Sequence, residues 1–485
     1  MKTKRFAAAG ILLIFVITFL TSFYDVFYSF DSLLRDKLYQ MPRGINNKIK
    51  IISIDDETLQ KIGPFGTWSR SVYADVINAL GDYPSVVTLD IMVFGDMDNE
   101  GDDALRQACL EHSNVIAGSY ITYDSVIKTD ENNKAYIDNF HIRSVEEPII
   151  SGCTATGFVN ATADDDGIVR SAFISENYDG KTIYSLAAQS YFLYCEKNGT
   201  APVKPKLDSN NRMWINYAGR PYDYEHISLS SVLDGTVDPR IFNGCIVLVG
   251  AYTSGLQDQF SVPNSSDQMF GVEIHANIIQ SLIDEKTSVP ANKLITSLLS
   301  AVITAAAFFL FGRLKIKAST PIMAALILAY GAVGIVLNMN GSIIPLLYAP
   351  LFILIGYLTN LGWKYAEAAI EKHKITAAFK KYVAPQVVEE ISKSGSYHIK
   401  LGGENRHIAV LFVDIRGFTP MSESLEPEQV VDILNSYLNL TTNAIFNNGG
   451  TLDKFIGDAT MAVFNAPFDL DDYIFRAVKT AVDIV

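Results

Sequence analysis

The stretch ASTPIMAALILAYGAVGIVLNMNGSIIPLLYAPLFILIGYLTNLGW (318–363) carries no charged side chain over 46 residues. A helix needs about 20 apolar residues to cross the hydrocarbon layer of a membrane, so this stretch is long enough for two crossings. The polar turn Asn338-Met339-Asn340-Gly341 divides it near its middle. Two further uncharged runs of 19 residues each, 6–24 and 294–312, precede it. The sequence therefore predicts four transmembrane helices, one at the start of the chain and three in a cluster.

Basic residues beside these runs indicate their orientation, because lysine and arginine collect on the cytoplasmic side of membrane proteins. They occur before the first run, after the second and after the fourth, whereas the turn between the third and fourth has none. All of them fall on one side if both termini are cytoplasmic, which places residues 25–292 outside the cytoplasm. We therefore expect a multi-pass protein of the cell membrane. The basic residues are Lys2, Lys4, Arg5, Arg313, Lys315, Lys317, Lys364, Lys372, Lys374, Lys380 and Lys381.

A cleaved signal peptide is the alternative for the first run. Its apolar core is too long for a signal peptide, and no Ala-x-Ala-like cleavage site follows it. The run 6–24 is therefore predicted to stay as a membrane anchor.

Charge is distributed unevenly along the 485 residues, which hold 53 acidic and 39 basic side chains for a net charge of −14. Residues 25–292 alone hold 37 acids and 20 bases, a net charge of −17. An acidic domain offers no footprint for nucleic acid, whose binding depends on neutralised phosphates. The same region holds all four cysteines, so disulfides with three possible pairings and buried free thiols both stay open. The cysteines are Cys109, Cys153, Cys195 and Cys245.

Strand-like and helix-like segments alternate through the outer region, which predicts a mixed α/β fold with helices covering a sheet. The expected strands are 49–54, 86–91, 115–117, 213–217 and 246–250, and the expected helices are 72–80, 104–110, 185–194 and 272–283.

Five segments of this region resemble the second type of CHASE domain, an extracytoplasmic sensor module found in front of cyclases and histidine kinases. The resemblance covers nearly all of 25–290 in order, and three transmembrane helices are its usual sequel. It implies that the domain senses an extracytoplasmic ligand, without naming that ligand. The segments are ISIDDETLQKIGPFGTWSR (52–70), GFVNATADDDGIVR (157–170), INYAG (215–219), FNGCIVLVGAYTSGLQDQF (242–260) and GVEIHANIIQ (271–280).

Several polar residues of the outer region could belong to a metal or ligand site, but their sequence patterns favour structural roles. The run Asp164-Asp165-Asp166-Gly167 lacks the alternating spacing and the distal glutamate of a calcium loop, so we interpret it as a hydrogen-bonded turn. His275 stands among apolar neighbours and is expected to be packed and hydrogen-bonded. Asp55 and Asp90 end strands, where open sheets place binding clefts, and position alone assigns them no function.

A charged segment, 364–403, follows the fourth apolar run and is rich in helix formers. Two copies of it could pair in parallel, or it could pack on its own domain, and the sequence leaves both readings open. Pro385 is expected to end or bend the helix. The residues near heptad spacing are Ala368, Ile375, Phe379 and Tyr382.

The last region, 404–485, begins with an apolar strand, 407–413, that ends in Asp414. A helix is expected over 428–446, followed by strands 451–456 and 460–464 that Gly457-Asp458-Ala459 joins as a hairpin. This order predicts the start of a ferredoxin-like α+β sheet. If the hairpin pairs beside the first strand, Asp414 and Asp458 meet at one edge and suit two Mg²⁺ or Mn²⁺ ions.

The motifs FVDIRGFTPMSE (412–423) and LDKFIGDATMAVFNAP (452–467) resemble class III nucleotidyl cyclases. The resemblance implies that Asp414, the carbonyl of Ile415 and Asp458 hold metal. It also implies that the backbone N–H groups of Gly417, Phe418 and Thr419 receive the nucleotide phosphates.

Lys454 matches the family position that reads the purine. Adenine N1 accepts a hydrogen bond and needs a donor, whereas guanine N1 carries a proton and needs an acceptor. A lysine therefore favours ATP over GTP and disfavours a guanylate cyclase. Strand alternation is expected to place Lys454 on the side of Leu452 and Ile456.

Class III enzymes carry further residues downstream: a second purine-reading residue and an Asn-x-x-x-Arg pair. The sequence ends at Val485 before that stretch, so we expect a piece of a longer cyclase with little or no turnover of its own. The family's sites form between two subunits, which implies a homodimer.

These patterns together favour a membrane-bound sensor adenylate cyclase that converts ATP to cyclic AMP and pyrophosphate. The alternative is a ligand-binding receptor with a catalytically incomplete cyclase-like output domain. The expected regions are an anchor (1–24), a sensor domain (25–292), three transmembrane helices (293–363), a coupling linker (364–403) and a cyclase domain (404–485).

Overall fold

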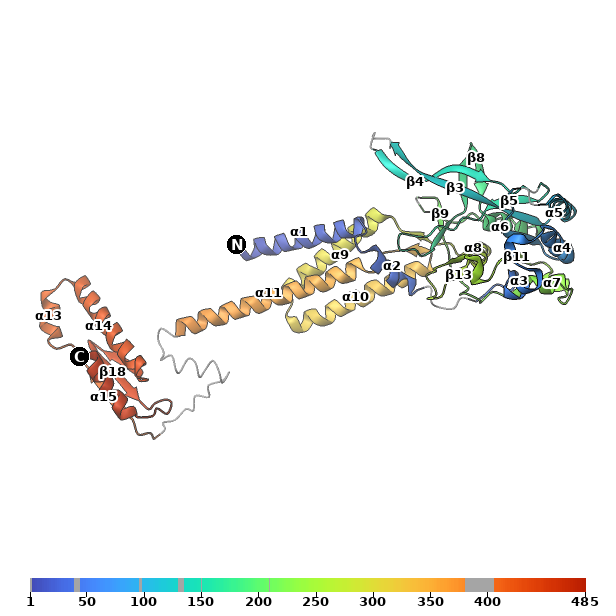
Figure 1. The fold of residues 1–485 in the computed structure, drawn as a ribbon. Helices are drawn as coiled ribbons and strands as arrows, with labels where there is room; N and C mark the ends of the chain where they lie inside the picture. Colours follow the sequence, from blue (N-terminus) through green and yellow to red (C-terminus); the bar gives the residue numbers. More distant parts are fainter. Residues whose placement is uncertain are drawn as a thin grey trace. The chain divides into compact units, whose positions relative to one another are not determined.

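The computed structural model divides into two compact units, Met1–Asn360 and Leu361–Val485, and each is described by itself (Figure 1). The predicted linker residues Tyr382 and Pro385 lie outside the described part of the chain. The described ranges are 2–38, 44–95, 98–129, 135–149, 151–208, 210–379 and 405–485.

A seven-stranded sheet lies at the centre of the first unit. Its strands follow the order β10-β1-β11-β2-β3-β4, of which only β4 is antiparallel to its neighbour, and β5 pairs with β3 off this path. All six residues of β1 are buried, as expected of a parallel strand covered on both faces. The strands are β1 (Ile49–Ile54), β2 (Val86–Met92), β3 (Val115–Thr129), β4 (Ala135–Glu146), β5 (Ala155–Phe158), β10 (His226–Ser228) and β11 (Ile246–Ala251).

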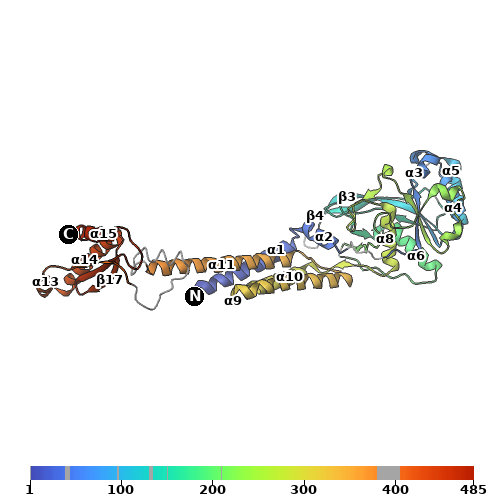
Figure 2. The same cartoon turned by 90° about the horizontal axis from the view of Figure 1, so that it is seen from below.

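Helices cover both faces of this sheet (Figure 2). Ile51 packs in the core that contains α6 and α8, whereas its neighbour Ile52 packs in the core that contains α4, α5 and α7. The predicted mixed α/β fold and its four predicted helices are therefore confirmed. The helices are α4 (Ser71–Leu80), α5 (Asn99–Glu111), α6 (Leu186–Lys197), α7 (Leu229–Leu233) and α8 (Gly271–Ile283).

Two strand predictions were wrong in extent. Strand β3 continues to Thr129 instead of ending at Ala117, and it forms a long ribbon with β4, which was not predicted. Residues of the ribbon beyond Ile121 are partly exposed or exposed, so they lack the apolar run that marks a buried strand. The predicted strand 213–217 is the shorter β9 (Arg212–Trp214), which pairs with β6 (Ser171–Phe173) outside the central sheet.

Shorter elements complete the outer domain. They are α3 (Asp56–Ile62), β7 (Ser175–Tyr178), β8 (Lys181–Tyr184), β12 (Gln259–Phe260), β13 (Met269–Phe270) and β14 (Val289–Pro290).

The four cysteines are free thiols in the structure. The sulfur atoms of Cys109 and Cys153 lie 3.0 Å apart. This contact lowers the pKa of the Cys153 thiol. Of the three possible pairings, the one between Cys109 and Cys153 is the one that this contact favours.

Arg170 is the centre of a buried ion-pair cluster, since only 1 % of its side chain is exposed. Its guanidinium donates to both oxygens of Asp36, at 2.9 and 2.7 Å, and also to Asp164 and Asp166. The predicted turn at 164–167 is confirmed by bonds such as Gly167 N to Asp164 O at 2.8 Å. Because Asp36 ends α2 (Tyr28–Asp36), the cluster fixes α2 to the sensor domain.

The four apolar runs form α1 (Lys2–Phe23), α9 (Lys293–Arg313), α10 (Ile316–Met339) and the first half of α11 (Tyr348–Phe379). Helix α1 lies along α9, where the hydroxyls of Ser22 and Ser297 are 3.0 Å apart (Figure 1). Helix α11 also contains the predicted start of the coupling linker.

The predicted count of four transmembrane helices is not confirmed. By length and hydropathy, α9 and α10 are candidate spans within the described residues, and α1 with α2 is a third if this pair, bent by 73°, forms one span. Helix α11 is not among these candidate spans. Ser342–Ile343 form strand β15 beside β14, so the helix begins only at Tyr348. A run of 16 uncharged residues, 348–363, then stands at its start, and the helix continues into the charged segment as far as Phe379.

The second unit contains a three-stranded antiparallel sheet in the order β16-β18-β17. Helices α14 and α15 pack on one face of it, around Ala462 and Phe464. The predicted strands, hairpin and helix over 428–446 are confirmed, and a short helix, α13, stands in the segment expected only to turn. The elements are β16 (Ala409–Val413), α13 (Phe418–Ser424), α14 (Pro427–Asn447), β17 (Thr451–Ile456), β18 (Ala459–Phe464) and α15 (Tyr473–Ile484).

Replacing Arg170 with methionine is expected to destabilise the outer domain by about 3–5 kcal/mol, because three acids would lose their shared cation. Urea unfolding of the full chain in detergent, followed by tryptophan fluorescence, measures this loss. Arg106→Met is the matched control, since the Arg106 side chain is 39 % exposed and pairs with an exposed Asp103. Equal stabilities of the two variants would show that the cluster does not stabilise the domain.

Candidate functional site

Asp414 and Asp458 lie side by side at one end of the second unit's sheet. Asp414 directly follows β16, whose last residue Val413 pairs with Thr460. Asp458 lies in the tight turn between β17 and β18, two residues before Thr460. The structure therefore brings together the two acids that the sequence predicts to meet.

Asp414 is exposed to solvent and Asp458 is partly exposed, and their carboxyl groups lie within hydrogen-bonding reach of each other. The pKa of Asp414 is raised because its carboxyl hydrogen-bonds with Asp458 and lies in the negative charge of Asp458. A divalent cation between the two carboxylates would relieve this repulsion, and carboxylate oxygens are its preferred donors. The described residues contain no group of three or more His, Cys, Asp or Glu side chains that could hold a metal, so these two acids would need backbone or substrate oxygens to complete a site.

The backbone after Asp414 supplies such groups. The Ile415 N–H donates to the Asp414 carboxylate at 3.0 Å. The Ile415 carbonyl accepts a long bond of 3.3 Å from Phe418 N–H, which leaves its second lone pair open. Gly417 has a positive φ of 76° and begins α13, so the N–H groups of Gly417, Phe418 and Thr419 belong to the start of that helix.

Lys454 does not lie where strand alternation places it. A β-bulge between Leu452 and Lys454 pairs them with Ala462 and Met461, which are successive residues of β18. Successive residues of a strand point to opposite faces, so Leu452 faces the helices and Lys454 faces the open side. The expectation that Lys454 shares a face with Leu452 was wrong, whereas its sharing a face with Ile456 is confirmed. Its Nζ lies 3.3 Å from Asp453 Oδ2 rather than at the acid pair.

Tyr437 of α14 was missed by the sequence analysis. Its hydroxyl is enclosed, with no hydrogen-bond partner among the described residues. Burial, followed by the charges of Asp414 and Asp458, raises its pKa. A tyrosine on a helix gives no signal in sequence of the site it faces, so only the fold reveals this neighbour of the acids.

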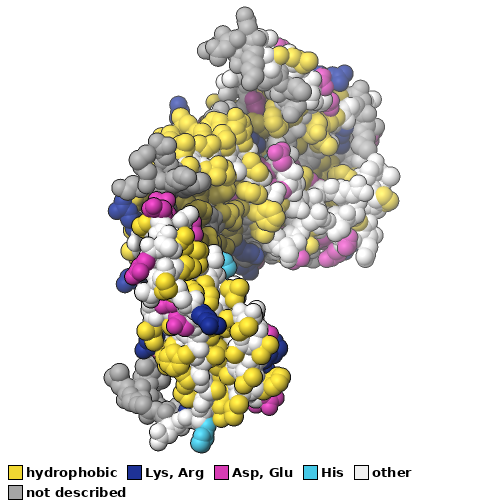
Figure 3. All heavy atoms as spheres, turned by 90° about the vertical axis from the view of Figure 1, so that its left-hand side faces the viewer, with side chains coloured by type: hydrophobic (Ala, Val, Ile, Leu, Met, Phe, Trp, Pro, Cys, Tyr) yellow, Lys and Arg dark blue, Asp and Glu magenta, His cyan; other side chains and the backbone are white. Residues whose placement is uncertain are grey.

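The face of the sheet away from α14 and α15 is apolar and open. Val410, Phe412 and Ile456 are 45 %, 61 % and 51 % exposed, and their register places them on this face together with Lys454. Hydrophobic side chains also cover much of the second unit's surface in Figure 3. An apolar face of this kind beside a cluster of acids suits a protein–protein contact.

A second cluster of titratable groups lies in the outer domain, around a cavity of about 60 Å³. Asp90, Asp258 and His275 line it, and His275 Nε2 lies 3.7 Å from Asp90 Oδ1. Burial raises the pKa of Asp90 to about 7, burial and the charge of Asp90 raise that of Asp258 to about 6, and burial lowers that of His275 to about 4. His275 is packed as predicted, although its Nδ1 has no hydrogen-bond partner in the described part of the chain.

Asp55, the other acid at a strand end, has a structural role. Its carboxylate caps α3 by accepting from Thr58 N at 2.9 Å, and it also accepts from Ser53 and Ser228. Burial disfavours the charge, but these hydrogen bonds outweigh it and lower the pKa of Asp55.

Comparison with protein families assigns both units. Residues 9–314 match the model of the CHASE2 domain, and the chain belongs to this family of sensor-domain proteins. Residues 403–485 match the adenylate and guanylate cyclase catalytic domain.

The curated relatives match about a fifth of the chain, and one of them is named as a cyclase. The chain is 40 % identical over 93 residues to an adenylate cyclase of Anabaena cylindrica, covering 19 % of this chain and 18 % of that protein. It is 35 % identical over 116 residues to the uncharacterized protein Rv1318c of Mycobacterium tuberculosis, covering 23 % and 21 %. The chain thus spans about a fifth of the length of these curated relatives.

Two solved structures of cyclases are similar to a comparable share of the chain. The adenylyl cyclase CyaB of P. aeruginosa is 40 % identical, with 16 % of this chain and 40 % of that chain covered and a TM-score of 0.16. The guanylyl cyclase Cya2 is 43 % identical, with 17 % and 43 % covered and a TM-score of 0.17.

The buried Asp90 is expected to make the outer domain less stable as pH rises. A carboxyl whose pKa is higher in the folded chain favours folding while protonated, so its contribution declines between about pH 4 and about pH 7. His275 opposes this trend below about pH 6.5, because the folded chain keeps it neutral. Asp90→Asn should therefore match the native chain in melting temperature at pH 4 and exceed it by several degrees at pH 8.

Thermal unfolding of the full chain in detergent at both pH values measures this difference. Asp75→Asn, at an exposed position of α4, is the control and should leave the pH dependence unchanged. A constant difference between Asp90→Asn and the native chain across this range would show that Asp90 does not titrate in the cavity.

Proposed function

We propose that this chain is part of a membrane-bound adenylate cyclase whose CHASE2 domain controls the formation of cyclic AMP. The observation that carries the proposal is the juxtaposition of Asp414 and Asp458 within a region that matches the cyclase catalytic domain. Isolated acids at a strand end and in a turn are common, whereas this pair stands in the order and spacing of the family's motifs.

The acid pair, with the Ile415 carbonyl, would hold Mg²⁺ or Mn²⁺ as two ions. When bound, such ions lower the pKa of the ATP 3′-hydroxyl and neutralise charge on the leaving pyrophosphate. The 3′-hydroxyl loses its proton to solvent, the new bond joins the 3′-oxygen to the α-phosphorus, and the bond from that phosphorus to the β-phosphate oxygen breaks, so pyrophosphate leaves. The N–H groups of Gly417, Phe418 and Thr419 would orient the phosphates.

Lys454 is proposed to read the adenine. It is 60 % exposed at the side chain on the open face of the sheet, where its ammonium can release Asp453 and donate to adenine N1. The same face carries Val410, Phe412 and Ile456. We propose that a second copy of the chain covers it, since a site at such a contact would draw groups from both copies.

The outer domain is proposed to lie outside the cytoplasm and the cyclase domain inside, with four passes through the cell membrane. The support is the distribution of basic residues beside the apolar runs, together with α9 and α10 as candidate spans. An extracytoplasmic ligand would then change how two output domains meet.

Asp414→Asn and Asp458→Asn are each expected to lower cyclic AMP formation by about 100-fold or more, because each removes a charged ligand at the reacting phosphate. The assay measures cyclic AMP that the whole membrane-inserted protein forms from ATP with Mn²⁺. Asp469→Asn is the matched control, since Asp469 is 94 % exposed and pairs with Arg406. Full activity in either of the first two variants refutes the metal assignment.

Lys454→Glu is expected to lower the ratio of ATP to GTP turnover by about tenfold or more, because a carboxylate accepts from guanine N1 and repels adenine N1. Rates with each nucleotide under the same conditions give the ratio. Lys479→Glu on α15 makes the same charge change outside the open face and should preserve it. An unaltered ratio in Lys454→Glu argues against its role in reading the purine.

A further inference from the structure

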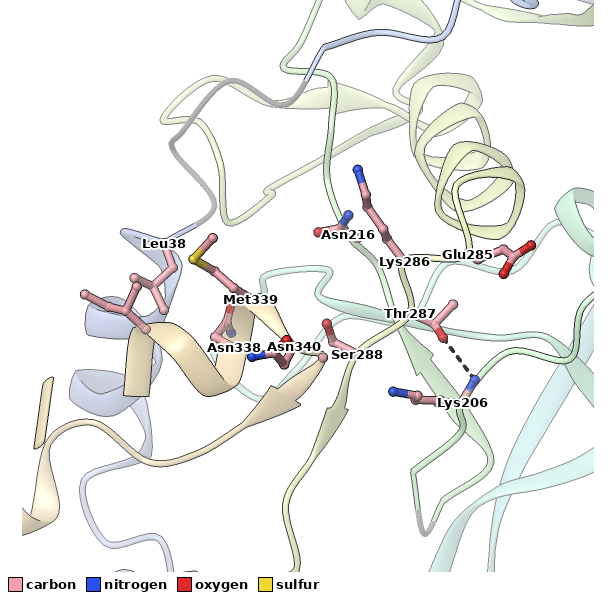
Figure 4. Close-up of a pocket in the computed structure, with 12 residues that line it drawn as sticks. Leu38, Lys206, Asn216, Glu285, Lys286, Thr287, Ser288, Asn338, Met339 and Asn340 are labelled. Carbon is pink, nitrogen blue, oxygen red and sulfur yellow. Dashed lines mark hydrogen bonds between the residues drawn. The ribbon is translucent and has the colours of Figure 1, made fainter. Parts of the chain in front are cut away.

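A larger pocket, of about 440 Å³, lies where the outer domain meets the end of α10 (Figure 4). We call it the juxtamembrane pocket. Residues 285–288 and Lys206 line it from the sensor side, and Ile335 with residues 338–341 line it from α10 and the turn that follows. Its size is that of ordinary small-molecule sites.

The lining of the juxtamembrane pocket has a net positive charge, although the surrounding domain is acidic. Lys206 and Lys286 line it and have no ion-pair partner among the described residues, whereas Glu285 is the single acid in its lining. Residues 25–292 carry a net charge of −17, so two unpaired lysines at one cavity depart from the rest of the domain. A cavity with this balance attracts an anion.

Asn216 adds a hydrogen-bonding side chain to the lining of the pocket. The residue is 8 % exposed and lines the pocket, and its side-chain amide has no hydrogen-bond partner among the described residues. Its backbone, by contrast, bonds to the Ser281 hydroxyl. Its amide atoms are not among the orphaned buried atoms, so they stay open to the pocket and can pair with a ligand or water there. In Figure 4, Asn216 lies beside Lys286.

The lining is apolar towards the membrane side. Ile335 and Met339 belong to α10, a candidate span, and Met339 is 81 % exposed. The end of a transmembrane helix lies at the level of lipid headgroups, where an amphiphile presents its anionic head beside its hydrocarbon chain. The pocket thus offers cations and an amide to the head and aliphatic side chains to the tail.

The pocket also joins parts of the chain that a sensor must connect. Lys206 N–H donates to Thr287 Oγ1 at 3.1 Å, and Val289 of β14 pairs with Ser342 of β15. Gly341, with a φ of 78°, turns the chain between α10 and β15, and any Cβ there would lie 2.8 Å from Thr287 O. A ligand here touches the sensor and the connection between α10 and α11 at once.

We propose that the juxtamembrane pocket binds an anionic phosphate group, carried either by a lipid of the adjoining leaflet or by a small soluble phosphate compound. Lys206 and Lys286 bind the charge, and Asn216 donates to a phosphate oxygen. The lipid source rests on the proposed membrane insertion, whereas the soluble source does not.

The test uses the purified full chain. Native mass spectrometry from a mixture of phosphatidylglycerol and phosphatidylcholine measures which lipid stays bound, and calorimetry in phosphatidylcholine nanodiscs measures binding of inorganic phosphate. Lys206→Gln and Lys286→Gln should each weaken the binding of phosphatidylglycerol or of inorganic phosphate, whichever is detected, by about fivefold, as expected for one lysine near an anionic headgroup. Asn216→Asp should weaken it at least as much, because it adds a negative charge inside the pocket.

Lys204→Gln is the matched control, because this exposed lysine lies two residues from Lys206 and outside the lining. Preference for phosphatidylglycerol that the pocket variants lose and Lys204→Gln keeps identifies a lipid, and phosphate binding with the same pattern identifies a soluble source. Absence of both, or equal losses in Lys204→Gln, overturns the proposal. The readout does not use cyclase activity, so an inactive output domain leaves the result unaffected.

Discussion

The contact between Arg170 and three carboxylates is the constraint on which the arrangement of the first unit depends. A guanidinium that is 1 % exposed has a high desolvation cost, and it is tolerated because its hydrogen bonds reach Asp36, Asp164 and Asp166 together. Two of these acids belong to a sensor turn, and the third ends α2. The cluster thus joins the α/β domain to the segment that follows the first apolar helix.

The other end of α2 contacts the start of α11. Asp31 accepts from the backbone N–H groups of Leu346 and Leu347 at 2.7 and 2.8 Å, and Arg35 pairs with Asp31. Helix α11 continues to Phe379. The juxtamembrane pocket borders the same connection through Gly341. The Asp31 contact and the juxtamembrane pocket therefore both involve the segment between α10 and α11. A change in either of them would shift the start of α11.

Local patterns predicted the buried strands, the amphipathic helices and the meeting of Asp414 with Asp458, because each depends on neighbours in sequence or on a hairpin. The bulge at Lys454 was not predictable, since strand alternation carries no mark of an inserted residue. The bond between Arg170 and Asp36 joins positions 134 residues apart, and the sequence treated the acids near Arg170 only as a turn. The start of α11 was misplaced because β15 pairing, a tertiary contact, overrode an apolar run.

Hydrogen–deuterium exchange at the amides of Leu346 and Leu347 tests the link through α2 most directly. Asp36→Asn removes the α2 partner of Arg170, whereas Asp166→Asn removes a partner within the sensor turn alone. If α2 transmits the position of the sensor to α11, Asp36→Asn accelerates exchange at these two amides and Asp166→Asn leaves it unchanged. Unchanged exchange in Asp36→Asn, with the native fold retained, would contradict the link.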